Sequence, residues 1–314
     1  MSTASTRSAA EKALRDLVAN VEQVVLGRSE AVRLLLVGFL AEGHVLLEDT
    51  PGTGKTTLAK ALARSLDLEF RRVQGTSDLL PSDLLGVSTW SAGEERFVFR
   101  PGPLFGSVVL VDELNRISPR TQSALLECME ERRATVDGVT HELPRPFLVL
   151  ATQNPLEFEG TYPLPESQLD RFLLRVTLGV PERAVEREIV RSRLAGDPLA
   201  TIAPVLRHAE CLATFDLVRA VTVHAAVLEY ALEIVAATRT SARLAAGASP
   251  RAALGLVRAA QAAAALEGRN FCIPDDVKGL ATAVLAHRVV PHEGERAEAE
   301  EELAEILGRT PVPA

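Results

Sequence analysis

The first half of the chain alternates short aliphatic runs with segments of helical periodicity. Lys55–Leu66 and Thr121–Glu131 carry apolar residues at helical spacing. Because nearly all-aliphatic strands are typical of parallel strands buried on both faces, the pattern predicts an α/β fold with helices covering both sides of a parallel sheet. The runs predicted as strands are His44–Leu47, Arg71–Gln74, Val108–Val111, Phe147–Thr152 and Leu173–Leu178.

The pattern of apolar residues changes after Pro181, where segments of helical periodicity replace the short aliphatic runs that predict strands. A last acidic segment, Glu293–Glu305, is predicted to be a helix with a solvated face. We therefore expect two domains in this chain of 314 residues, an α/β domain over residues 1–180 and an all-helical domain over residues 181–314. The Ala- and Leu-rich segments that predict the second domain are Glu182–Leu194, Phe215–Thr238, Pro250–Glu267 and Pro274–Leu285.

Charge and cysteine usage limit the partners and the location that we expect. The 34 Lys and Arg residues against 42 Asp and Glu residues give a formal net charge of −8, which disfavours general binding to nucleic acid. The three cysteines lie far apart, so neither a disulfide framework nor a structural zinc site is predicted. The sequence offers no clean apolar run of about 20 residues and no N-terminal signal pattern. We expect a cytoplasmic protein without a membrane span.

The segment DTPGTGKT, which begins at Asp49, resembles a phosphate-binding loop between a predicted strand and a predicted helix. Gly52 and Gly54 allow backbone amides to wrap a phosphate, and the following helix points its positive end at the same anion. Lys55 would bridge the β- and γ-phosphates, and Thr56 would hold Mg²⁺. The usual pattern begins with glycine, whereas this chain has Asp49 there. Because a carboxylate would repel phosphate, we expect Asp49 to turn away, toward loop amides.

Two further predicted strands end in polar residues that suit ATP hydrolysis. Asp112 and Glu113 follow four buried aliphatic positions, and parallel strands present functional groups at their carboxyl ends. Asp112 would bind the Mg²⁺ shell, and Glu113 would act as the general base on the attacking water. Asn154 ends another strand and could orient the same water. The set predicts an ATPase rather than a simple kinase or GTPase.

Several longer phrases of the sequence carry a closer resemblance. They are LEDTPG from Leu47, VDELNR from Val111, SALLECMEE from Ser123, ATQNP from Ala151, GTYPLPE from Gly160, SPRA from Ser249 and PDDV from Pro274. These phrases resemble the MoxR family of AAA+ ATPases, and the similarity extends over roughly residues 25–287. The resemblance implies an αβα sandwich with a parallel five-stranded core sheet, hairpin insertions and a C-terminal helical lid.

The resemblance also implies roles for individual residues. Val25, Leu26 and Gly27 resemble the apolar cradle for adenine. Arg171 matches the arginine finger that the family supplies to a neighbouring subunit, with a structural ion pair to Asp170 or Glu166 as the alternative. Arg251, at the start of a predicted lid helix, matches the second-sensor arginine that reports the γ-phosphate to the lid. The nucleotide loop implied by the family comprises Asp49, Thr50, Pro51, Gly52, Thr53, Gly54, Lys55, Thr56 and Thr57.

Two hairpin-like insertions are expected in the first domain. One lies between Gly86 and Pro103, and the other, Ala134–Thr140, contains an Asp-Gly pair that is typical of a tight hairpin turn. In related rings such hairpins face the central pore or a partner. Decoration of the sheet edge is an equally weighted alternative.

The resemblance implies a Mg²⁺-dependent ATPase that forms a ring, expected to be a hexamer, and remodels or matures a partner protein through metal or cofactor insertion or complex assembly. The expected partner carries a von Willebrand factor A-type domain. The alternatives are a DNA-translocating motor, a nucleotide-dependent scaffold that barely hydrolyses ATP, and a subunit of the magnesium-chelatase or gas-vesicle type. The acidic charge balance counts against the motor. The complete set Lys55, Asp112, Glu113 and Asn154 counts against the scaffold.

Overall fold

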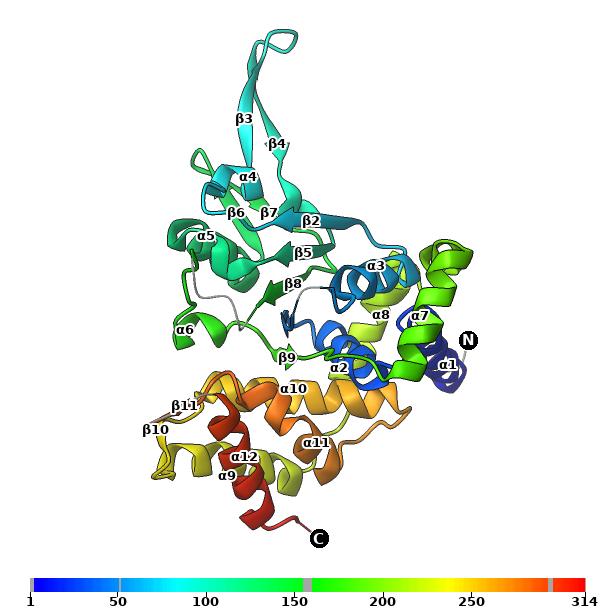
Figure 1. Ribbon diagram of the computed structural model, residues 1–314, viewed down its shortest axis with the longest axis vertical. Helices are drawn as coiled ribbons and strands as arrows, with labels where there is room; N and C mark the ends of the chain where they lie inside the picture. The colour runs from blue at the N-terminus through cyan, green and yellow to red at the C-terminus, as the bar shows by residue number, and fades with distance from the viewer. Residues whose placement is uncertain (1–2, 51, 155–159, 293–295, 314) are drawn as a thin grey trace.

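The computed structural model describes residues 3–50, 52–154, 160–292 and 296–313. At its centre lies a parallel five-stranded sheet with the strand order β2-β5-β8-β1-β9 (Figure 1). The five strands predicted from the sequence are confirmed, with ends that shift by one or two residues. Their bounds are β1 Val45–Glu48, β2 Phe70–Gln74, β5 Val108–Asp112, β8 Leu148–Gln153 and β9 Leu174–Val176.

Alternate side chains of the central strands enter two different apolar clusters. Val108 and Leu110 of β5 belong to one cluster, whereas Val109 and Val111 belong to the other. The period of two along a strand therefore supplies apolar side chains to both faces of the sheet, which explains why these runs are aliphatic throughout. Helices α1 (Thr3–Glu22), α2 (Ser29–Leu40) and α3 (Lys55–Ser65) cover the first face, and α4 (Pro81–Leu85) and α5 (Pro119–Glu131) cover the second. The expected αβα sandwich is confirmed.

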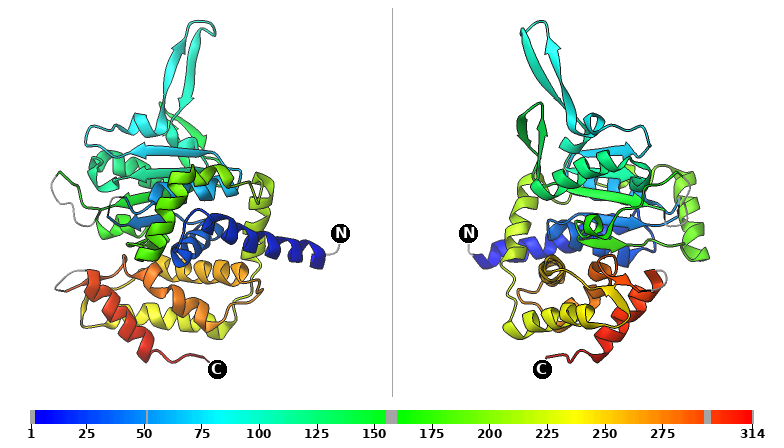
Figure 2. Two further views of the ribbon diagram at one scale, coloured as in Figure 1. Left: turned by 45° about the vertical axis from the view of Figure 1, so that its right-hand side comes forward. Right: turned by 90° about the vertical axis from the view of Figure 1, so that its left-hand side faces the viewer.

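Both expected hairpins are present. β3 (Gly86–Ser91) and β4 (Arg96–Pro101) form an antiparallel ribbon that projects far from the body of the molecule (Figures 1 and 2). β6 (Arg133–Val136) and β7 (Val139–Glu142) form a shorter ribbon at its base. Asp137 and Gly138 have φ values of 51° and 78°, as the Asp-Gly turn signal predicts.

Helices dominate the chain after β9. Before β9 the chain also contains the short 3₁₀ turns η1 (Pro103–Phe105) and η2 (Leu114–Arg116) and the short helix α6 (Glu166–Leu169). After β9 it contains the 3₁₀ turn η3 (Pro198–Thr201). The helices are α7 (Arg183–Ala195), α8 (His208–Arg219), α9 (Ala225–Thr240), α10 (Pro250–Leu266), α11 (Pro274–Leu285) and α12 (Arg296–Arg309). In Figure 1, α10 runs beneath the sheet beside α2, with α9, α11 and α12 below it.

The structure corrects three details of the sequence prediction. The continuous helix expected over Phe215–Thr238 is broken, because Thr222 pairs with the segment around Phe271 and His224 caps a new helix through its Nδ1. The all-helical second half also holds a short antiparallel ladder of β10 (Leu244–Ala246) and β11 (Val290–Pro291). Finally, the pattern of strands and helices did not predict α1 and α2.

One apolar cluster is continuous between the sheet and the helices of the second half. It contains Leu47 and Leu174 of the sheet together with Leu256 of α10 and Leu280 of α11. Because this cluster spans both halves of the chain, the division into residues 1–180 and 181–314 stays a prediction. Among the described residues, no helix has both the length and the apolar character that crossing a membrane requires.

Candidate functional site

A cavity of about 350 Å³ opens at the carboxyl ends of three adjacent strands, β1, β8 and β5. Because β8 lies between β1 and β5, the strand order puts Asn154 between the phosphate-loop strand and the strand that ends in Asp112. Residues far apart in the sequence thus share one site. The lining residues are Gly52, Thr53, Gly54, Lys55, Thr56, Thr57, Arg72, Gln74, Asp112, Glu113, Thr152 and Asn154. Pro51 lies outside the described residues.

The loop geometry suits an anion. Gly52 and Gly54 have φ values of 85° and 100°, which side chains rarely tolerate, so glycine is required at these two turns. Lys55 opens helix α3, and its Nζ donates to the carbonyls of Asp49 at 2.8 Å and Thr50 at 3.1 Å. Burial lowers the pKa of Lys55, an effect that nearby carboxylates oppose. A phosphate entering the loop can exchange for the two carbonyl acceptors of this amine.

Asp49 is turned toward backbone amides, as its unusual position predicted. Its Oδ1 accepts from the N–H of Thr50 at 2.9 Å, and its Oδ2 accepts from Leu178 at 2.9 Å and Gly179 at 2.7 Å. The residue is 7% exposed. This carboxylate therefore joins the start of the phosphate loop to the chain that leaves β9, and it does not line the cavity.

The two adjacent carboxylates at the end of β5, Asp112 and Glu113, are held in different ways. Glu113 has a φ of 56°, a left-handed conformation uncommon outside glycine, which turns its side chain out of the line of the strand. Its N–H donates to Thr152 Oγ1 at 2.9 Å, and that hydroxyl donates to Asp112 Oδ1 at 3.3 Å. Strand β8 thus fixes the backbone and the first carboxylate at the end of β5.

Two residues of β2 that line the site, Arg72 and Gln74, were not predicted from the sequence. Arg72 Nε donates to Asp112 Oδ2 at 2.7 Å, and Gln74 Nε2 donates to Glu113 Oε2 at 2.9 Å. Arg116 Nε pairs with the same Oε2 at 3.2 Å. The sequence carried a signal, because Arg71, Arg72 and Gln74 give this strand polar positions up to its end, unlike the aliphatic strand β5 beside it. Their partners became visible only when the parallel pairing set Gln74 opposite Asp112.

The donor set fits Mg²⁺. The Thr56 hydroxyl and the Asp112 carboxylate are hard oxygen donors that line the same cavity. Within the described ranges, no group of three or more His, Cys, Asp and Glu side chains could hold a metal by itself. Mg²⁺ is usually held by one or two protein oxygens together with nucleotide phosphates, and Thr56 and Asp112 can supply two such oxygens.

The segment expected to cradle adenine lies outside the lining of this cavity. Val25 is buried, and Gly27 has a φ of 67°. A Cβ at Gly27 would lie 2.7 Å from Val185 Cγ1, so glycine allows α7 to approach closely. Arg28 donates to the Gly179 carbonyl at 2.5 Å. Segment 25–28 therefore meets the same residue, Gly179, that Asp49 binds.

Arg171 and Arg251 lie together in a second cavity, of about 230 Å³, which shares no lining residue with the phosphate-loop cavity. Glu130 of α5 joins them: its Oε1 is 2.8 Å from Arg251 Nη1, and its Oε2 is 3.3 Å from Arg171 Nε. Neither arginine therefore lines the phosphate-loop cavity of its own chain. The ion-pair alternative for Arg171 named Asp170 or Glu166, but the carboxylate that the structure pairs with it is Glu130.

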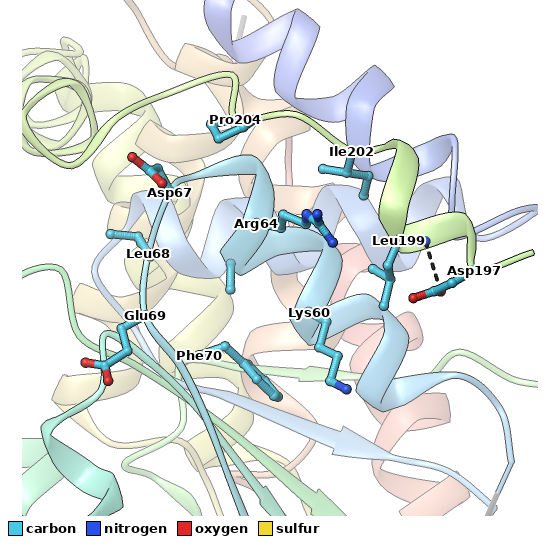
Figure 3. A pocket seen from close by; sticks show the side chains of 11 residues that line it. Lys60, Arg64, Asp67, Leu68, Glu69, Phe70, Asp197, Leu199, Ile202 and Pro204 are labelled. Carbon is cyan, nitrogen blue, oxygen red and sulfur yellow. Dashed lines mark hydrogen bonds between the residues drawn. The ribbon is translucent and has the colours of Figure 1, made fainter.

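A third cavity, of about 760 Å³, lies at the opposite end of α3 from the phosphate loop. Figure 3 shows Lys60 beside the ring of Phe70, with the Lys60 Nζ 5.9 Å from the ring centre. Two cations, Lys60 and Arg64, face three carboxylates around an apolar floor. This balance of charge selects no class of ligand.

Comparison with known proteins gives consistent matches. Residues 44–174 match the family model described as "ATPase family associated with various cellular activities (AAA)", and residues 236–306 match an AAA lid domain. An uncharacterized Bacillus subtilis protein, YeaC, is 45% identical over 94% of this chain and 93% of its own. Chaperone MoxR1 of Mycobacterium tuberculosis is 40% identical over 88% of this chain and 75% of its own.

Protein MoxR of Paracoccus denitrificans is 36% identical, with 88% of each chain covered. A crystal structure of a Cytophaga hutchinsonii protein, provisionally described as an ATPase, superposes with a TM-score of 0.91 at 35% identity. That superposition covers 99% of this chain and 98% of the other.

Proposed function

Because this chain belongs to the MoxR family of AAA+ ATPases, we propose that it works as a Mg²⁺-dependent ATPase ring, a hexamer, that remodels or matures a partner protein. The chain hydrolyses ATP as a member of that family. The observation that carries the proposal is the single cavity in which Lys55, Asp112, Glu113 and Asn154 meet.

The residues of that cavity divide the work of hydrolysis. The loop amides and Lys55 would hold the β- and γ-phosphates, and Thr56 with Asp112 would hold Mg²⁺, which neutralises phosphate charge when bound. Glu113 accepts the proton of the attacking water, and Asn154 orients that water by hydrogen bonding. Gln74 and Arg116 both bind Oε2 of Glu113. These contacts hold the carboxylate through Oε2, so we assign Oε1 to the attacking water.

Arg171 and Arg251 are assigned to the neighbouring subunit's nucleotide. Both lie in a cavity separate from the phosphate loop of their own chain, and guanidinium groups suit the spread charge of a transferring γ-phosphoryl group. A head-to-tail ring would bring this cavity against the phosphate loop of the next copy. The assignment of Val25, Leu26 and Gly27 to adenine, and the division of the chain at residue 180, belong to the same proposal.

The proposed client is a protein with a von Willebrand factor A-type domain. The name of the Mycobacterium relative, a chaperone, supports action on a protein partner. Pull-down with a tagged chain in ATP should enrich such a client. Stimulation of turnover by DNA that vanishes at high salt would favour the translocating motor instead.

A subunit-mixing experiment tests the shared active site. Lys55→Ala removes the phosphate-binding cation but leaves Arg171 for the neighbour, and Arg171→Ala does the reverse. Each variant alone should be nearly inactive. Random equal mixing makes about a quarter of the interfaces complete in a head-to-tail ring, so ATPase activity should reappear in the mixture.

Mixing each variant with the unaltered chain is the control. If partly mutant rings keep turnover and the two variants still fail to complement one another, Arg171 does not act on the neighbouring site.

A further inference from the structure

The second cavity is rich in arginine although the chain as a whole is acidic. Five arginines and three carboxylates line it: Arg132, Arg171, Arg251, Arg258 and Arg288 with Glu42, Glu130 and Asp170. His44 also lines it, but burial lowers the pKa of His44 to about 4, so this ring is neutral at pH 7. We call this cavity the arginine recess. Its excess of positive charge stands against the formal charge of −8 of the whole chain.

Arg288 supplies a fixed charge at the base of the recess. Its side chain is only 3% exposed, and its Nε lies 3.0 Å from Asp170 Oδ1. Its Nη2 donates to the carbonyl of Phe172 at 2.8 Å, whereas its Nη1 has no hydrogen-bond partner among the described residues. Burial lowers the pKa of Arg288 to about 10, which still leaves it charged at neutral pH. The recess is therefore built to attract an anion.

Within one chain, that anion is supplied by Glu130. Its two oxygens are divided between Arg251 at 2.8 Å and Arg171 at 3.3 Å. All three side chains remain accessible to solvent, with exposed fractions of 40% for Glu130, 42% for Arg251 and 28% for Arg171. Ion pairs with this much exposure are weak, so a stronger anion can displace the carboxylate.

We propose that Glu130 is a placeholder for the γ-phosphate of a nucleotide bound to a second copy of the chain. This inference rests on the proposed function, in which Arg171 and Arg251 act across the subunit interface. In the separate subunit, Glu130 neutralises and aligns the two guanidinium groups. At the interface they exchange the single charge of this carboxylate for the multiple charge of the γ-phosphate, whose oxygens match the guanidinium geometry.

The exchange makes subunit association depend on the γ-phosphate. A diphosphate on the neighbouring copy offers no terminal group at this position, so Glu130 keeps both arginines. A triphosphate competes with Glu130 and must first displace it. Removing the carboxylate should therefore strengthen association in the triphosphate state and leave the diphosphate state unchanged.

Glu130→Gln tests the proposal, with Glu131→Gln as the matched control. Glu131 has a similar exposure, 47%, but pairs with Arg133 and does not line the recess. Self-association is measured by sedimentation at a series of protein concentrations with Mg²⁺ and either ATPγS or ADP. With ATPγS, Glu130→Gln should lower the concentration for half-maximal association about three- to tenfold, which corresponds to the loss of two weak competing ion pairs. With ADP it should cause no shift.

The other outcomes distinguish the placeholder role of Glu130 from the proposed active site shared between subunits. An unchanged or raised midpoint for Glu130→Gln in ATPγS overturns the placeholder role while leaving the shared active site intact. An equal shift in ADP, or the same shift for Glu131→Gln, means that general charge reduction is the cause and also overturns it. If the unaltered chain associates equally in ATPγS and ADP, this inference fails while the proposed ring stands; if it associates in neither nucleotide, both fail.

Discussion

Replacing Asp49 by alanine removes a carboxylate that joins the phosphate loop to the chain leaving β9. Three backbone N–H groups, those of Thr50, Leu178 and Gly179, lose their acceptor at distances of 2.7 to 2.9 Å. The residue is 7% exposed, so water replaces the lost acceptor poorly. The variant thus tests whether the Asp49 carboxylate stabilises the fold through these three hydrogen bonds.

The magnitude follows from these three contacts. A hydrogen bond to a charged group contributes roughly 1.5–3 kcal/mol, and partial rehydration of the loop recovers part of the loss. We expect the free energy of unfolding to fall by about 3–5 kcal/mol, and the melting temperature by about 5–10 °C for a chain of this length. Asp49→Asn keeps one acceptor oxygen and should lose about half as much.

Urea unfolding followed by circular dichroism measures the effect, with binding of a fluorescent ATP analogue recorded in parallel. Asp216→Ala is the control, because that carboxylate is 77% exposed and meets Arg219 only at 3.4 Å. It should change stability by less than about 0.5 kcal/mol. A fall of less than about 1 kcal/mol in the free energy of unfolding of Asp49→Ala would refute this stabilising role. A large gain in ATP affinity would mean that Asp49 opposes the nucleotide.

Three further predictions concern Glu113, the proposed general base, and the buried histidines. Glu113→Gln should bind ATP normally but lower kcat at least about 100-fold in a coupled ATPase assay, because the amide cannot accept the proton of the attacking water. Loss of ATP binding in this variant would mean that Glu113 has a structural role. Gln74→Ala should lower kcat about three- to tenfold at constant KM, because Glu113 loses the 2.9 Å bond that orients it, and an unchanged kcat would contradict that role. Burial lowers the pKa of His44 to about 4 and that of His287 well below its usual value. The unfolded chain therefore binds these protons first as the pH falls below about 6.5. The free energy of unfolding should fall by about 1.3 kcal/mol per histidine between pH 7 and pH 5.5 in urea titrations. In the His44→Gln variant this fall should be smaller by the contribution of His44. A free energy of unfolding that does not change over this pH range would contradict the prediction.

The sequence by itself determined the local elements of the site. The aliphatic runs before Asp49, Asp112 and Asn154 predicted three of the strands, and the glycines around Lys55 predicted a loop whose backbone amides can wrap a phosphate. These signals are local, because strand periodicity, turn chemistry and a helix start each depend on neighbours within a few residues. Even the outward turn of the Asp49 carboxylate followed from its charge beside a phosphate loop.

The helix break near Thr222 shows where local reasoning fails. The Ala- and Leu-rich pattern from Phe215 onward reads as one helix, yet three β-branched residues at Val221, Thr222 and Val223 favour an extended backbone. The partner that stabilises this extended segment, around Phe271, lies almost 50 residues away along the chain. No window of the sequence contains both sides of that contact.

Tertiary structure alone decided which charged groups meet. Strand pairing set Gln74 opposite Asp112 and thereby gave Glu113 its hydrogen-bond donor. The packing of α10 under the sheet brought Arg251 to Glu130, about 120 residues earlier in the chain, and moved it away from the phosphate loop. Pairings of this kind depend on where distant elements dock, and docking is set by the buried apolar faces rather than by the charged residues that happen to meet there.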